Sequence, residues 1–163
     1  MADNSKDQLK ADPIDLLLDE EMLKLSIPHL VKPEDLNHHG TLFAGQMARW
    51  LIEAGLILSS RLTGKPEDIV CVRLNAMTFK KPVNNGDLIE IRSMISFLGS
   101  TSIMVYSQVL RKQETVPVIT NSATFVTVDK DGRPYKHGLK LPDRYIDENR
   151  DIYEEALKIR EQK

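Results

Sequence analysis

Cysteine is almost absent from this sequence, since Cys71 is the only one in 163 residues. A single cysteine excludes a disulfide within the chain and fits a reducing compartment. The four histidines do not show the spacing of zinc ligands, and the adjacent pair His38 and His39 is not a metal motif by itself. No metal site is therefore expected.

Long apolar runs and an excess of one charge are also missing. No stretch is apolar over the length that a membrane-spanning helix needs, and the polar, acidic start MADNSKDQLKADPIDLLLDEE lacks the character of a signal peptide. With 22 basic and 24 acidic residues the net charge is −2, and no basic stripe predicts nucleic-acid binding. These absences predict a cytoplasmic protein with neither membrane nor nucleic-acid partners.

What is present is enough apolar sequence for one core. Hydrophobic residues make up 41% of the chain and charged residues 28%, as in a globular domain. We expect one domain over residues 21–140 and a helical extension over 141–163. Residues 1–20 are expected to be partly disordered or to form a short helix that begins at Asp12-Pro13.

Hydrophobic periodicity predicts one long helix among extended segments. Apolar residues recur with helical spacing from 42 to 62, and Gly64 and Pro66 are typical of the helix end. Strands are expected at 22–31, 69–83, 87–99, 102–112 and 116–132, and Pro28 is expected to interrupt or end the first. A polar amphipathic helix is expected over 147–162. This order predicts an α+β fold, an antiparallel sheet with its helices on one face.

The long helix carries one acidic residue, Glu53, within the apolar run LIEAGLIL. A carboxylate in an apolar setting is costly unless it is paired or hydrogen-bonded. A structural interpretation is a surface ion pair with Arg49, four residues earlier. The preceding loop has structural interpretations too, because histidines often cap or face solvent and glycines permit turns and close packing. The combination of loop and acid favours a functional interpretation.

Three motifs together resemble the acyl-CoA thioesterases of the hotdog-fold superfamily. They are NHHGTLFAGQMARWLIEAG from Asn37, MTFKKPVNNGD from Met77 and SATFVTVDKDGRP from Ser122. The resemblance covers residues 22–134 and implies a curved antiparallel sheet wrapped around the long central helix. It also implies a homo-oligomer whose protomers pair edge to edge as dimers, often within tetramers or hexamers, with sites at the dimer interface.

The chain departs from the family pattern at the acid and in the loop. The family places its carboxylate seven residues after the second glycine of a Gly-Gly pair, a position that Ile52 holds here, and Glu53 follows it. The pair itself is Ala44-Gly45, and Thr41 stands where Asn or Asp is usual. One helical residue rotates a side chain by about 100°. Either Glu53 acts from a rotated position or the chain has lost the catalytic carboxylate.

The resemblance implies roles for five residues of this segment. The N–H of Gly45 or Gln46 at the helix start would donate to the thioester oxyanion. Glu53 would be the general base for water, or attack directly to form an anhydride. Gln46 would orient the water, and Asn37 or His39 would bind the thioester or its leaving group.

Another set of residues is expected to bind the CoA part of the substrate. Lys80, Lys81 and Arg111 are candidates for phosphate contacts, although basic residues at strand ends are often only solvated. Ser100 and Thr101, in the turn GSTS, are candidates for the pantetheine or a phosphate. No cofactor is expected, because CoA is part of the substrate and product.

The sequence thus predicts an acyl-CoA thioesterase that hydrolyses the thioester to a free acid and CoA. A non-catalytic acyl-CoA-binding module is the alternative, which Ile52 and Thr41 favour. A hotdog dehydratase acting on a 3-hydroxyacyl thioester ranks third, because the distinctive Asp and His pair of those enzymes is not visible.

Overall fold

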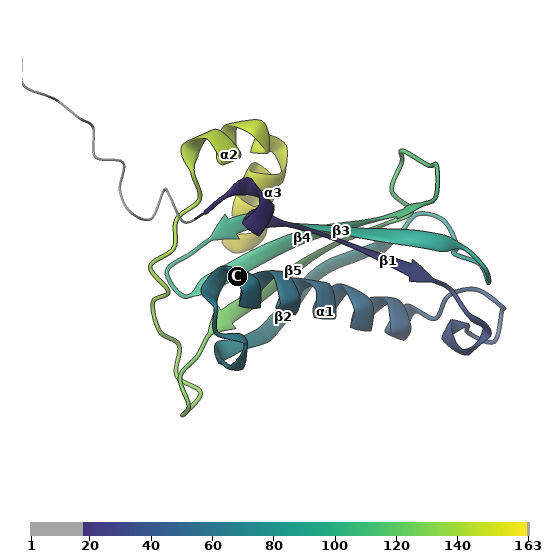
Figure 1. Ribbon diagram of the computed structural model, residues 1–163, viewed down its shortest axis with the longest axis horizontal. Helices are drawn as coiled ribbons and strands as arrows, with labels where there is room; N and C mark the ends of the chain where they lie inside the picture. Colours follow the sequence, from purple (N-terminus) through teal and green to yellow (C-terminus); the bar gives the residue numbers. More distant parts are fainter. Residues whose placement is uncertain (1–17, 163) are drawn as a thin grey trace, which may run out of the picture.

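The computed structural model describes residues 18–162, and most of the short helix expected from Asp12 lies outside them. Strand β1 (Lys24–Leu30) precedes the long helix α1 (Ala44–Thr63) (Figure 1). Short 3-10 turns lie before β1 and on either side of α1: η1 (Glu20–Leu23), η2 (Pro33–Asp35) and η3 (Pro66–Asp68). The remaining elements are β2 (Ile69–Phe79), β3 (Leu88–Leu98), β4 (Ser102–Arg111), β5 (Ile119–Thr127), α2 (Asp143–Glu148) and α3 (Arg150–Glu161).

The five strands form one antiparallel sheet in the order β1-β3-β4-β5-β2. Helix α1 lies lengthwise along one face of this sheet, as Figure 1 shows. The predicted α+β hotdog architecture is therefore confirmed. Among residues 18–162, no helix is long and apolar enough to cross a membrane.

Pro28 lies inside β1, so the prediction that it interrupts or ends the strand is wrong. It stands opposite Glu90 of β3, and the strand continues to Leu30. Because β1 is an edge strand, a residue without an N–H can be accommodated there.

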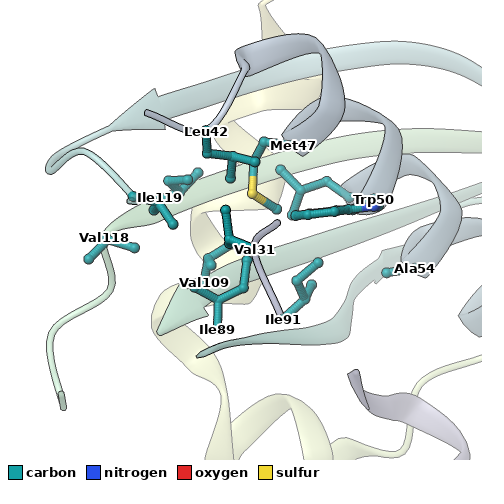
Figure 2. Packing of buried hydrophobic residues seen from close by; sticks show 12 residues of the cluster. Val31, Leu42, Met47, Trp50, Ala54, Ile89, Ile91, Val109, Val118 and Ile119 are labelled. Carbon is teal, nitrogen blue, oxygen red and sulfur yellow. The ribbon is translucent and has the colours of Figure 1, made fainter. Parts of the chain in front are cut away.

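Helix α1 packs on the sheet through two core clusters. In its first half, Met47 and Trp50 extend toward Val31 and Ile91, in the cluster that Figure 2 shows. In its second half, Leu58 packs in a second cluster that includes Ile95, Ile103, Val105 and Phe125. These clusters explain why the helix is apolar around most of its circumference.

The close approach of α1 to the sheet depends on Gly55. A Cβ at this position would lie 2.5 Å from the ring of Phe125, which is fully buried. At the C-terminal end, Gly64 adopts a φ of 69° and donates its N–H to the carbonyl of Ser60 at 2.8 Å. Gly64 thus terminates α1 as predicted.

Helix α3 lies on the opposite face of the sheet, so the prediction that the helices share one face is wrong. Along β4, Ile103 and Val105 face α1, while Met104 between them packs with Phe97 and Ala156 of α3. The strand alternation places Met104 on the other face. A register shift in β3 just before Phe97 brings that ring to the same face. This apolar patch explains the position of α3.

Candidate functional site

Asn37 builds the polar loop before α1. Its Oδ1 accepts hydrogen bonds from the N–H groups of His39 at 2.8 Å and Thr41 at 3.2 Å, and its Nδ2 donates to Thr41 Oγ1 at 3.0 Å. Gly40 takes a φ of 80°, which favours glycine. One Nδ2 hydrogen of Asn37 has no acceptor within residues 18–162 and remains available to a ligand.

The start of α1 has three free backbone donors. The first helical hydrogen bond runs from the N–H of Met47 to the carbonyl of Phe43 at 3.1 Å, and no side chain among residues 18–162 caps the helix. Within the described part of the chain, the N–H groups of Ala44, Gly45 and Gln46 donate to no acceptor. These groups carry the positive end of the helix dipole, so they can bind a negatively charged oxygen.

Gly45 gives the helix start its shape. A Cβ on Gly45 would lie 2.4 Å from Cε1 of Phe43, whose side chain is 54% exposed. A glycine is therefore needed to keep the Phe43 ring folded over the first turn.

A cavity of about 340 Å³ opens beside this helix start. Its lining includes Asn37, Thr41, Ala44, Lys80 and Lys81. The structure thus brings two of the predicted phosphate ligands together with the loop and the first residue of α1. Two ammonium groups beside free N–H donors form a site suited to an anionic ligand.

His39 lies in the same loop and is exposed. Its backbone N–H supports the turn through Asn37, and its ring lies 3.9 Å from the ring of His38. Across residues 18–162, no group of three or more His, Cys, Asp and Glu side chains could hold a metal ion.

Ser100 and Thr101 lie in a different cavity from the helix start. That cavity, also of about 340 Å³, lies by the turn between β3 and β4 and is lined in addition by Arg73 and Arg160. Neither arginine was predicted from the sequence, because the first lies on β2 and the second on α3. The predicted CoA ligands therefore fall into two groups within one protomer.

Arg111 is already paired in the protomer. Its Nη2 lies 2.8 Å from Glu114 Oε1, and its Nη1 donates to the carbonyl of Pro82 at 3.3 Å. The hydrogen bonds with Glu114 raise the pKa of Arg111 above its usual value. Because Pro82 lines the cavity beside the helix start, Arg111 is hydrogen-bonded to the wall of that cavity.

Glu53 lies on the exposed side of α1. No ion pair joins it to Arg49 in the part of the chain that the structure describes, which removes the structural interpretation of this pair. Ile52, by contrast, packs half-buried against the second core cluster. Position 53, and not 52, therefore presents its side chain to the surface.

Glu53 and the helix start of the same protomer are far apart. Glu53 follows Gly45 by eight positions, and a rise of 1.5 Å per residue places them about 12 Å apart along the axis. A glutamate side chain is too short to span that distance. One protomer alone therefore does not bring the carboxylate to the free N–H groups.

Comparison with known proteins identifies the family of this chain. The pattern of the Thioesterase superfamily matches residues 39–118. The acyl-CoA thioester hydrolase YciA of Salmonella typhimurium is 31% identical over 119 residues, which cover 68% of this chain and 87% of that protein. The chain belongs to the acyl-CoA thioesterase family. The prediction of a thioester hydrolase family is confirmed.

Solved structures of acyl-CoA thioesterases have the same fold. The acyl-CoA hydrolase of Bacillus cereus superposes with a TM-score of 0.78 at 26% identity, covering 88% of each chain. The acyl-CoA hydrolase of Staphylococcus aureus, solved with butyryl-CoA, CoA and CoA disulfide, gives 0.73 at 26% identity, covering 88% of this chain and 85% of that one. The hexameric thioesterase y2039 of Yersinia pestis gives 0.63 at 27% identity, covering 71% and 94%.

Some curated acyl-CoA thioesterases are matched over less of their length. The aligned segment spans 62% of an uncharacterized acyl-CoA thioester hydrolase of Bacillus subtilis, and 20% of acyl-coenzyme A thioesterase 11 of mouse. The shared part in both is thus a thioesterase-like segment of a longer chain.

Two residues near the acyl-CoA thioesterase motif, Asp35 and His29, were not predicted from the sequence. Asp35 is buried, and its carboxylate accepts hydrogen bonds from Gln46 and from the backbone of Lys32. The ring of His29 stacks on that of Trp50 with centroids 4.4 Å apart. The alternation of apolar residues in β1 was a usable signal for His29, because it places residues 25, 27 and 29 on the side of α1.

His29 is expected to make stability depend on pH. Burial lowers the pKa of His29 below its usual 6.5, with Glu53 and Asp35 acting in the opposite direction. The folded state therefore binds a proton less readily than the unfolded state. Stability is fully present above pH 6.5 and falls as the pH drops through that value.

Replacing His29 by glutamine is thus expected to reduce the slope with which the free energy of unfolding falls between about pH 7 and pH 5. Urea unfolding at several pH values measures the slope, and His38→Gln, at an exposed histidine of the loop before α1, is the control. Equal slopes for wild type and His29→Gln would contradict the prediction.

Proposed function

We propose that this chain hydrolyses the thioester of an acyl-CoA to a free acid and CoA. The observation that carries the proposal is the start of α1. Its first three N–H groups donate to no acceptor among residues 18–162, and its first residue, Ala44, lines a cavity together with Lys80 and Lys81. Donors fixed at the position of a developing negative charge are usually the largest contribution to acyl-transfer catalysis. The names of the relatives support acyl-CoA as the substrate class.

The proposed reaction uses Glu53 as the general base. Glu53 takes one proton from a water molecule, whose oxygen forms a bond to the thioester carbonyl carbon. The carbonyl electrons move onto the oxygen, which the N–H groups of Gly45 and Gln46 stabilise. When the carbonyl re-forms, the C–S bond breaks and the CoA sulfur leaves as a thiolate, which takes up the proton held by Glu53 and returns Glu53 to its carboxylate form. Direct attack by Glu53 through an anhydride would use the same groups.

The distance along α1 supports a site shared by two protomers. The 12 Å between Gly45 and Glu53 is closed if the carboxylate of one protomer faces the helix start of another. Edge strand β2 exposes Val70, Val72 and Leu74, which are 38%, 56% and 39% exposed. An exposed apolar edge strand is a surface for pairing with a second copy. The proposed homo-oligomer therefore contains at least a dimer of this kind.

We propose that Lys80 and Lys81 bind the phosphates of CoA, because they share a cavity with the helix start. Within residues 18–162, one Nδ2 hydrogen of Asn37 has no acceptor and would bind the thioester or its leaving group, and His39, whose N–H is bonded to Asn37, would assist. Ser100 and Thr101 would contact CoA from a neighbouring protomer, since their own cavity is separate. Arg111 would act through Pro82 and not by direct contact.

Purified protein incubated with acyl-CoAs of increasing chain length tests the function. A thiol reagent that reports free CoA is expected to show turnover for at least one chain length. Calorimetry that finds acyl-CoA binding without turnover at any length would instead favour the acyl-CoA-binding module, for which Ile52 at the usual acid position is the motivating feature.

A further inference from the structure

Asp35 is the only charged side chain in the buried set within residues 18–162, with 4% of its surface exposed. A buried carboxylate is costly unless its oxygens accept hydrogen bonds. Both oxygens do so here. Oδ2 accepts the backbone N–H of Lys32 at 2.9 Å, and Oδ1 accepts Nε2 of Gln46 at 3.0 Å. Asp35 is therefore tied to the third residue of α1.

This contact fixes the orientation of the Gln46 amide. A carboxylate has no hydrogen to donate, so the amide must turn its NH₂ group toward Asp35 and its Oε1 away. Within the described residues, no group donates a hydrogen bond to that Oε1. The amide oxygen is therefore an unused acceptor, and its orientation is fixed by the hydrogen bond between the amide and the buried carboxylate of Asp35.

The held oxygen lies in the first turn of α1. The backbone N–H of Gln46 is one of the three free donors, so donor and acceptor belong to the same residue. A thioester oxyanion would be repelled by Oε1 and attracted by the N–H groups. A water molecule, which has hydrogens to donate, would be held by Oε1 instead.

We propose that Asp35 is a positioning residue that keeps Gln46 Oε1 available to the attacking water. This inference rests on the proposed thioester hydrolysis. One O–H group of the water donates a hydrogen bond to Oε1 and stays intact. The other O–H group loses its proton to Glu53 as the new C–O bond forms. Asp35 touches neither the water nor the substrate, and acts only through the Gln46 amide.

Asp35→Asn inverts the hydrogen bond with little change in shape. The oxygen of the new amide can still accept the N–H of Lys32, which leaves its NH₂ facing Gln46. Gln46 would then turn Oε1 toward position 35 and present NH₂ to the water. We expect kcat to fall about tenfold, the effect of losing one oriented hydrogen bond, with KM changed less than about twofold.

A double-mutant cycle separates this role from a structural one. Gln46→Met removes the amide and keeps the chain length. If Asp35 acts through Gln46, Asp35→Asn is expected to lower kcat no further in the Gln46→Met background. Multiplying losses would overturn the proposal, because they would show that Asp35 acts through its backbone contacts to the loop.

The sequence offers a matched control. The tetrapeptide Lys-Pro-Glu-Asp occurs at 32–35 and again at 65–68, and both copies contain a 3-10 turn. Asp68 binds the hydroxyl of Tyr135 and does not contact Gln46. Asp68→Asn is therefore expected to keep wild-type kcat and KM.

The outcomes distinguish this inference from the function on which it rests. A wild-type protein that hydrolyses no acyl-CoA overturns both. A wild type that turns over while Asp35→Asn keeps its kcat overturns the role of Asp35 alone. If Asp35→Asn does not fold, Gln46→Met, which leaves the bond to Lys32 intact, decides the matter: unchanged kcat overturns the proposal and a loss of about tenfold supports it.

Discussion

Replacing Glu53 by glutamine is expected to lower kcat for acyl-CoA hydrolysis by about 10²–10⁴-fold. Glutamine has the same size but cannot take a proton from water. Glu53 is exposed and forms no ion pair within residues 18–162, so its replacement should change stability little. KM should stay close to the wild-type value, because the lost interaction belongs to the transition state.

Steady-state kinetics with the best substrate of the chain-length series measures this effect. Arg49→Gln, an exposed neutralisation one turn earlier on α1, is the matched control and should leave kcat unchanged. Near-normal turnover by Glu53→Gln would remove Glu53 from the proposed mechanism.

Replacing Gly45 by proline is expected to lower kcat by about 10²–10³-fold, because proline has no N–H to donate to the oxyanion. Proline is tolerated in the first helical turn, where the N–H groups have no intrahelical acceptor. Gly45→Ala is the matched control, since its Cβ displaces the Phe43 ring in the same way but its N–H remains. Equal losses in the two variants would attribute the effect to Phe43 and not to the donor.

Circular dichroism should show the same helix content for both Gly45 variants, because α1 is stabilised by its two core clusters and not by its first turn. KM is expected to change less than kcat in Gly45→Pro, since an oxyanion donor acts mainly after the carbonyl has been attacked.

The sequence predicted the main elements because each has a strong local pattern. The helical spacing of Met47, Leu51, Ala54 and Leu58 located α1 to within two residues at either end. The alternating runs located the strands of the sheet. The face occupied by α3 was not predictable, because it depends on the register shift before Phe97, which has no clear local signal.

Only the residues of the candidate site that belong to a sequence motif were predictable. The segment from Asn37 to Glu53 located the loop, the helix start and the acid, and the helical rise alone sets the distance between the last two. Asp35 was not predictable, because Asp68 has the same three preceding residues and yet has a different partner. The burial of Asp35 and its contact with Gln46 depend on the tertiary structure.

The separation of the CoA candidates has the same physical origin. Lys80 and Lys81 share a cavity with the helix start because β2 ends there, whereas Ser100 and Thr101 lie at the turn after β3. Distance between strand ends is set by the sheet order β1-β3-β4-β5-β2. That order follows from pairings between residues far apart in the sequence.

Subunit complementation tests most directly whether two protomers share one site. Glu53→Gln and Gly45→Pro chains with different affinity tags would be co-expressed, and the mixed oligomer purified through both tags. A mixed dimer contains one site with both wild-type groups and one site that lacks both. It is therefore expected to recover about half of the wild-type kcat, although each variant alone is nearly inactive. A mixed oligomer as inactive as its parents would contradict the shared site.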